Sequence, residues 1–269
     1  EEEDGDNDHD VTVEHLCNLC KTSDFVCRGG TGLALEMIRK DMHMIAAKEA
    51  DSFEPDDAVI HLRLGDALRG SYDQGIGMLP HATYAAIIKE AESEKSNNSN
   101  SGGQKVDTIS IVTVPFEKKV ARSFDRRQVD RSRVFATDLR DYLRTAFPNA
   151  TVTIHNGADE TTVRAFARLV RAKKVAICSP STFCTWPVLA VHKDHNALAY
   201  VYESKTHNPW VHEDPYVRKH APNLRTYSAR RYPNHRIQNS TNAQVLKWAR
   251  NEAAYGPVCS PEMDAMFGC

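Results

Sequence analysis

Short apolar runs alternate with longer segments of mixed polarity along residues 56–204. Each run has the length of a buried strand and is rich in β-branched residues, which favours a sheet. The segments between the runs suit helices, and this strand–helix alternation is typical of a doubly wound parallel sheet. We therefore predict a Rossmann-like α/β domain whose strands lie at residues 59–62, 108–114, 150–157, 175–178 and 197–203.

Helices are expected between these strands and on both sides of the domain. The first, within residues 27–50, has an apolar face made of Met37, Ile38, Met42 and Ile45. The polar run SEKSNNSNSGGQK at 93–105 predicts a disordered surface insertion. The remaining helical segments begin near Pro80 or lie within 117–133 (charged and only partly helical), 138–147, 159–173, 179–190 and 242–254.

Composition and charge narrow the class of protein. With 269 residues, 41% of them hydrophobic and 26% charged, the chain can bury a core as a soluble globular protein. A formal net charge of −2 provides no basic field, so no nucleic-acid partner is expected. No apolar run is long enough for a membrane span, and no signal peptide is found at the start. Because the sequence opens with EEEDGDNDHD and not with Met, we expect a fragment whose membrane-anchoring segment is not in this sequence.

Cysteines and glycosylation sequons bear on the compartment. The cysteines at 17, 20, 27, 259 and 269 lie near the two ends of the sequence and suggest disulfides that tie the termini down. The pair in CNLC (17–20) could instead be half a zinc site, although no second CxxC or HxxxH completes it. Sequons at Asn97, Asn149 and Asn239 either arise by coincidence or carry glycans. Together the two features favour the lumen of the Golgi or endoplasmic reticulum.

The first candidate site follows the strand at 59–62. The segment HLRLGD presents His61, Arg63 and Asp66 where the strand ends, and Gly65 allows a sharp turn there. Polar side chains at the carboxyl ends of strands are where open α/β sheets bind ligands. A guanidinium grips two phosphate oxygens at once and an imidazole adds a donor. The alternative is a structural Arg63–Asp66 pair.

The second candidate site follows the strand at 175–178. The segment SPSTFCTWPVLA (179–190) predicts a hydroxyl-rich turn and then an apolar helix. Ser181 and Thr182 would then stand at or beside the helix N-cap, where hydroxyls and free backbone N–H groups bind anions. The alternative is an ordinary capped core helix.

Together, HLRLGD at 61–66 and STFCTW at 181–186 resemble the motifs of the fucosyltransferase superfamily, which contains the α1,2-, α1,6- and protein O-fucosyltransferases. Its members carry an HxRRxD or HxRxGD segment and, about a hundred residues later, an STF-type segment. The resemblance covers Val59 to Ala190. It implies a GT-B glycosyltransferase that moves fucose from GDP-fucose to a glycan or glycoprotein with inversion, without a metal or another cofactor.

The resemblance also implies roles for individual residues. Arg63 would bind the diphosphate and stabilise the leaving GDP, because fixed cationic donors lower the barrier as charge develops on the phosphate. His61 would add a donor, and Ser181 and Thr182 would hold phosphate oxygens. Phe183 is counted among the substrate-binding residues of the second motif, although packing in the core is the favoured role for it.

An inverting transfer also needs an acid–base residue near the acceptor hydroxyl. Asp66 is expected to orient Arg63 or bridge to the sugar. Asp73 is the proposed catalytic base, against the alternative of a solvated loop charge. Two positions depart from the family pattern. Leu64 replaces the second arginine, and the acidic residue that reads guanine has only Asp159 and Glu160 as nearby candidates.

Three regions result from this interpretation. Residues 1–55 hold an acidic tail, the cysteine cluster and a helix, as a small or truncated acceptor-side domain. Residues 56–204 bind the GDP-sugar, and residues 205–269 form an extension that packs back on the core. The alternatives are an inactive nucleotide-sugar or glycan-binding domain with the same fold, or a transferase that uses another nucleotide sugar.

Overall fold

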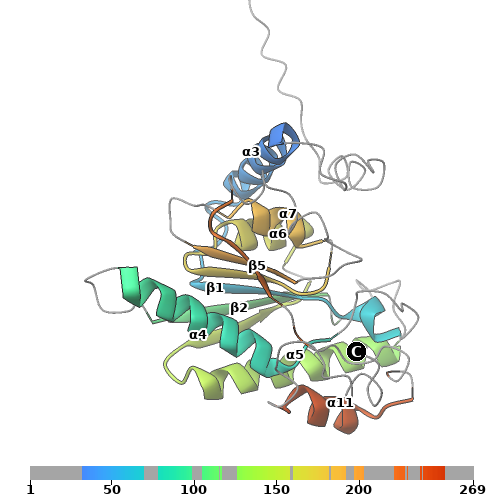
Figure 1. The fold of residues 1–269 in the computed structure, drawn as a ribbon. Helices are drawn as coiled ribbons and strands as arrows, with labels where there is room; N and C mark the ends of the chain where they lie inside the picture. The colour runs from blue at the N-terminus through green and yellow to red at the C-terminus, as the bar shows by residue number, and fades with distance from the viewer. Residues whose placement is uncertain are drawn as a thin grey trace, which may run out of the picture.

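The computed structural model describes residues 32–69, 78–98, 105–114, 116, 126–157, 160–181, 183–191, 197–202, 221–227, 229, 237 and 239–251. Its centre is a six-stranded sheet in the order β3-β2-β1-β4-β5-β6, with every neighbouring pair parallel (Figure 1). In this order the chain reverses its direction of travel across the sheet between β1 and β4. The predicted α/β class is confirmed, and the sheet is compatible with a Rossmann-like fold.

The strands occupy most of the predicted positions. Five of them coincide with the apolar runs: β1 Ala58–Leu62, β2 Thr108–Thr113, β3 Thr151–His155, β4 Val175–Cys178 and β5 Leu198–Tyr202. The sixth, β6 Leu224–Tyr227, was not predicted, and it pairs with β5. The sheet therefore extends beyond residue 204, into the region expected to be only an extension.

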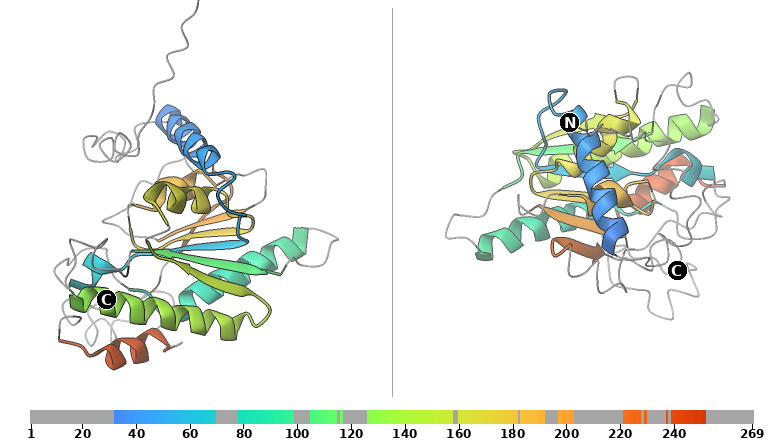
Figure 2. Two further views of the ribbon diagram at one scale, coloured as in Figure 1. Left: turned by 180° about the vertical axis from the view of Figure 1, so that it is seen from behind. Right: turned by 90° about the horizontal axis from the view of Figure 1, so that it is seen from above.

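Helices cover both faces of the sheet (Figures 1 and 2). Alternate residues of β1 divide between the faces: Ile60 and Leu62 pack with α4 His81–Asn98, α5 Arg126–Ala146 and α11 Asn242–Ala249. Val59 packs on the other face with α6 Thr162–Val170 and α7 Thr185–Leu189. Because both faces of every central strand are covered, the strands are almost wholly apolar.

Helix α3 Gly32–Lys48 lies outside α6 and α7. Ile38, Met42 and Ile45 form its buried face, against Phe166 and other residues of α6. Met37, which was expected on that face, is 59% exposed. A step of one residue turns a helix by about 100°, so Ile38 takes the inward position and Met37 lies beside it, toward solvent.

Two helices are longer than the sequence suggested. Helix α4 continues to Asn98, six residues into the segment expected to be disordered, and residues 99–104 lie outside the described part. Helix α5 is a single helix of 21 residues that joins the end of the charged stretch to the predicted helix at 138–147. The charged N-terminal half of α5 was expected to be a solvated face, but its residues Gln128, Arg131 and Ser132 are buried.

Buried polar contacts hold the C-terminal segment on α5. The Arg131 guanidinium donates to the carbonyls of Ile237 and Ser240, both at 2.6 Å, and to Asn242 Oδ1 at 3.1 Å. Farther along the helix, Arg250 pairs with Asp138.

Of the helices in the described ranges, none combines the length and apolar composition needed to cross a bilayer.

His81 also bonds Asp138, with its Nε2 2.9 Å from Oδ2. Burial tends to raise the pKa of Asp138, but the hydrogen bonds from His81 and Arg250 outweigh it and hold the pKa at about 2. The carboxylate is therefore charged at neutral pH and links α4, α5 and the end of α11.

Replacing Arg131 tests the attachment of the C-terminal segment. Arg131→Met keeps the apolar stem but removes the hydrogen bonds to two carbonyls and to Asn242, so the free energy of unfolding should fall by about 3 kcal/mol or more. Urea denaturation measures it. The control, Arg140→Met, removes an ion pair with the adjacent Asp141 and should change stability by less than about 1 kcal/mol. Equal effects of the two variants would contradict the proposed attachment.

Candidate functional site

The two sequence motifs meet because β1 and β4 are neighbours. In the parallel register Ile60 pairs with Ile177 and His61 with Cys178. The ladder continues past the strand, where the Ser179 N–H donates to the His61 carbonyl at 3.3 Å. Both strands end at the carboxyl edge of the sheet, at the point where the strand order reverses. This is the usual ligand position in open α/β sheets.

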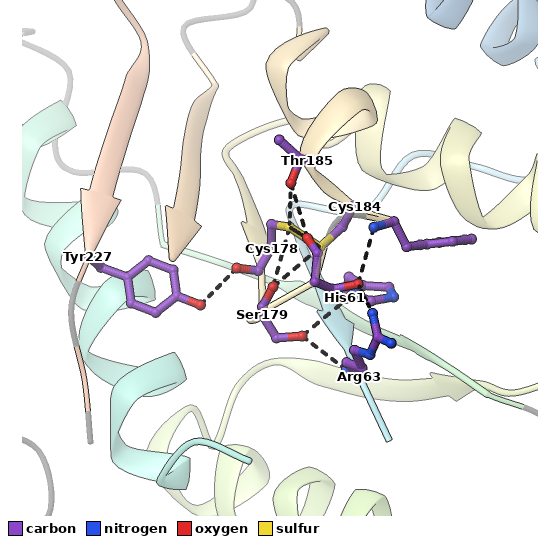
Figure 3. Close-up of a disulfide and its surroundings, with 9 residues drawn as sticks. His61, Arg63, Cys178, Ser179, Cys184, Thr185 and Tyr227 are labelled. Atoms are coloured by element: carbon purple, nitrogen blue, oxygen red, sulfur yellow. Dashed lines mark hydrogen bonds between the residues drawn. A yellow bond between two sulfur atoms is a disulfide. The ribbon is translucent and has the colours of Figure 1, made fainter. Parts of the chain in front are cut away.

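Arg63 connects the motifs through two hydrogen bonds (Figure 3). Its backbone N–H donates to Ser179 Oγ at 3.0 Å, and its Nη1 donates to Ser181 Oγ at 3.2 Å. Ser181 Oγ also accepts the backbone N–H of Phe183 at 3.2 Å. Arg63 is half-buried, whereas both serines are buried. A cationic side chain thus leaves β1 and rests on the turn that follows β4.

His61 lies in the protein interior, beside this contact. Its ring stacks on Phe183 with centroids 4.9 Å apart, and Nδ1 lies 3.5 Å from Ser179 Oγ. Burial, helped by the positive charge of Arg63, lowers the pKa of His61 to about 3. The imidazole is neutral at neutral pH and has one N–H to donate.

Phe183 packs as expected. Besides His61, its ring meets Phe166 of α6 at a centroid distance of 4.5 Å. The side chain therefore fixes the turn against α6 and does not line the site as a free aromatic surface.

A disulfide between Cys178 and Cys184 encloses the turn. Cys178 is the last residue of β4, Cys184 precedes α7, and both are fully buried. The sequence interpretation expected disulfides at the termini instead, but those cysteines lie outside the described residues. The signal for this pair was weak: a separation of six residues across a turn, with Cys178 hidden in an apolar run.

Helix α7 begins later than the sequence interpretation placed it. Its N-cap is Cys184, which makes no side-chain cap hydrogen bond, so Ser181 is not the capping residue that was expected. The Ser181 hydroxyl instead accepts from Arg63, and its carbonyl accepts from Thr185 Oγ1 at 3.1 Å. Ser181 therefore belongs to the site as a hydrogen-bond partner of Arg63 and not as a helix cap.

The structure describes only some of the other predicted site residues. Thr182, Asp73 and Asp159 lie outside the described residues. Asp66 lies in the 3-10 helix η1 Gly65–Arg69, whose first residue has a φ of 66°, a conformation that favours glycine. The Gly65 N–H donates to Ser132 Oγ of α5 at 3.2 Å, which fixes the chain just after Arg63.

Glu160, the other acid considered for base recognition, has partners of its own. Its Oε1 accepts from Arg168 Nε at 2.8 Å, and its Oε2 lies 3.7 Å from His155 Nδ1. Burial raises the pKa of Glu160, in opposition to Arg168. Burial, with the charge of Arg168, lowers the pKa of His155 to about 4.

Tyr227 is a site residue that the sequence interpretation missed. It lies on β6, and its hydroxyl donates to the Cys178 carbonyl at 2.8 Å, so it supports the end of β4 from two strands away (Figure 3). Only a prediction of β6 could have revealed it.

Chemically, this edge of the sheet suits an anion. It has a half-buried guanidinium, backed by a buried neutral imidazole and two buried serine hydroxyls, and groups of these types donate to phosphate oxygens. Among the described residues, no group of three or more His, Cys, Asp or Glu side chains is placed to hold a metal ion.

Comparison with known proteins gives no name to this arrangement. No protein-family model matches the chain, and no curated protein or solved structure matches it significantly.

The neutral state of His61 predicts an acid-sensitive fold. Between pH 6.5 and about 3 the unfolded chain binds a proton at His61 that the folded chain does not, so stability falls as pH falls. His155 acts in the same direction down to about pH 4. The variant His61→Phe keeps a ring against Phe183 and cannot titrate. Its loss of folding free energy between pH 7 and 5 should be smaller than that of the wild type, by up to about 1.4 kcal/mol for each pH unit. Urea unfolding at both pH values measures this, and an unchanged loss would contradict it.

Proposed function

We propose that the chain binds a nucleotide sugar and transfers the sugar, as a GT-B fucosyltransferase that uses GDP-fucose with inversion and without a metal. The observation that carries the proposal is the Arg63–Ser181 hydrogen bond. It joins HLRLGD and STFCTW, the two segments that resemble the fucosyltransferase motifs, where the strand order reverses. Residues that are 118 positions apart would not meet in this way by local folding alone.

The charges at the site support binding of a diphosphate. Breaking the bond between a sugar and a diphosphate develops negative charge on the β-phosphate, and a preorganised guanidinium stabilises that charge. Arg63 is held by Ser181 and by its own backbone bond to Ser179, so little reorganisation is needed. His61 is neutral and donates without adding a second positive charge beside Arg63.

In the proposed reaction the acceptor hydroxyl attacks C1 of fucose from the side opposite the diphosphate. The C1–O bond to the β-phosphate breaks, its electron pair leaves with GDP, and the acceptor proton passes to a carboxylate. Asp73 is the proposed base, and Asp66 is proposed to orient Arg63 or bridge to the sugar. The acceptor is a glycan or glycoprotein.

The proposed location is the Golgi or endoplasmic reticulum lumen. The Cys178–Cys184 disulfide supports an oxidising compartment. Asn149, in the turn between α5 and β3, and Asn239 are exposed, as a glycan requires.

Two observations favour an alternative, in which the site binds another nucleotide sugar or binds without transfer. Leu64, at the position of the family's second arginine, is fully buried and provides no phosphate contact. Glu160 is paired with Arg168, so reading guanine would require it to exchange or share that partner.

Binding of GDP tests the proposal directly. GDP should bind more tightly than UDP in calorimetric titrations, and Arg63→Ala should weaken GDP binding by roughly ten- to hundredfold, through loss of a charge-assisted contact. Arg144→Ala, which removes an exposed arginine of α5, is the matched control. The proposal is wrong if GDP does not bind the wild type, and preference for UDP would favour the alternative sugar nucleotide.

Transfer of labelled fucose tests the catalytic base. Asp73→Asn should lower kcat by about 10²- to 10⁴-fold, the usual contribution of acid–base catalysis, and leave GDP affinity near that of the wild type. Asp66→Asn should instead weaken GDP binding if it orients Arg63. Full activity of Asp73→Asn would reject Asp73 as the base, while GDP binding without transfer to any of a panel of glycan and glycoprotein acceptors would favour the inactive binding domain.

A further inference from the structure

We infer that Cys178 and Cys184 are positioning residues for the anion site, and that reduction of their disulfide lowers the site's affinity for a diphosphate. The inference depends on the proposed function for the identity of the ligand. Its basis is the path of the covalent ring, which runs through the residues that contact Arg63 and His61.

Within the described part of the chain, three residues inside this ring contact Arg63 or His61. Ser179 Oγ accepts the Arg63 N–H, and Ser181 Oγ accepts Arg63 Nη1. Phe183 stacks on His61. These three residues alternate along the five-residue turn between Cys178 and Cys184, so the disulfide closes the loop on both sides of them (Figure 3).

The two ends of the ring belong to different elements, the strand β4 and the helix α7. Cys178 is paired with His61 on one side and Val201 on the other, and Tyr227 bonds its carbonyl. Cys184 starts a helix of only five residues and provides no side-chain cap. The disulfide therefore ties the start of α7 to the end of β4. Closing a short loop in this way removes conformations in which the serines point away from Arg63.

Reduction has a definite chemistry. A dithiol such as dithiothreitol attacks one sulfur, the Sγ–Sγ bond breaks, and two thiols remain at Cys178 and Cys184 while the dithiol becomes a cyclic disulfide. Two electrons and two protons pass to the protein. Because both cysteines are fully buried, the attack requires the turn to open first.

Ligand and disulfide are then coupled in both directions. If the oxidised turn binds the diphosphate better, the bound diphosphate must make the disulfide harder to reduce by the same factor. Coupling of this kind is typically about 5- to 150-fold. A disulfide that only stabilised the fold, without placing the serines, would not show this reciprocity.

The test measures GDP affinity by calorimetry for the oxidised protein and for protein reduced by dithiothreitol, with free thiols counted by mass spectrometry after alkylation. Reduction should weaken GDP binding by at least about fivefold. GDP should slow alkylation of Cys178 and Cys184 in the presence of the dithiol. The double variant Cys178→Ala/Cys184→Ala should bind weakly whether or not dithiol is present, which separates this disulfide from the other five cysteines.

Hydrogen exchange provides a readout that needs neither GDP nor the variant. The Arg63 and Phe183 amides donate to Ser179 and Ser181, so reduction should speed their exchange while amides of β1 such as Ile60 keep their protection. Unchanged exchange after complete reduction overturns the inference. Equal GDP affinity of the two redox states overturns it as well and leaves the proposed function standing, whereas no GDP binding to the oxidised protein rejects the proposed function alone.

Discussion

The parallel pairing of β1 with β4 is the constraint on which the candidate site depends. It places Arg63 and Ser181, which are far apart in sequence, at adjacent strand ends, and it fixes their register through the His61–Cys178 pair. The pairing in turn depends on burial. Val59, Ile60, Ala176 and Ile177 are fully buried between the two helical layers, so a shift of one residue would exchange the side chains that pack against each layer.

Burial also determines how charge is distributed at this edge. His61 packs between Phe183 and Ser179 and stays neutral, while Arg63 remains half-buried and carries the positive charge. The Arg63 guanidinium donates to the Ser181 hydroxyl.

The sequence predicted the strands that are long and apolar, and with them the strand ends that carry His61 and Arg63. It missed β6 because Arg225 and Thr226 interrupt the apolar pattern, and those side chains lie at the edge of the sheet, where polar residues are tolerated. With β6 it missed Tyr227 as a support of β4. The two motifs could be matched from sequence, but their contact is a property of the strand order.

Tertiary contacts explain the remaining differences. Arg131 looks like a surface charge, and only the carbonyls of Ile237 and Ser240 make its burial favourable. Cys178 lies in an apolar strand and is fully buried, so in the sequence it resembles an ordinary core residue. Its pairing with Cys184 follows from the tight turn between β4 and α7. Local patterns contain no signal for the contacts of Arg131 and only a weak one for the disulfide, the separation of six residues across a turn.

The central claim is that Arg63 and Ser181 act as one anion site, and a double-mutant cycle tests it most directly. GDP binding energies would be measured by calorimetry for the wild type, Arg63→Ala, Ser181→Ala and the double variant. Residues that bind the diphosphate as a unit should be non-additive, with an interaction energy of about 0.5–3 kcal/mol. Additive effects, or no effect of either substitution on GDP binding, would contradict the account.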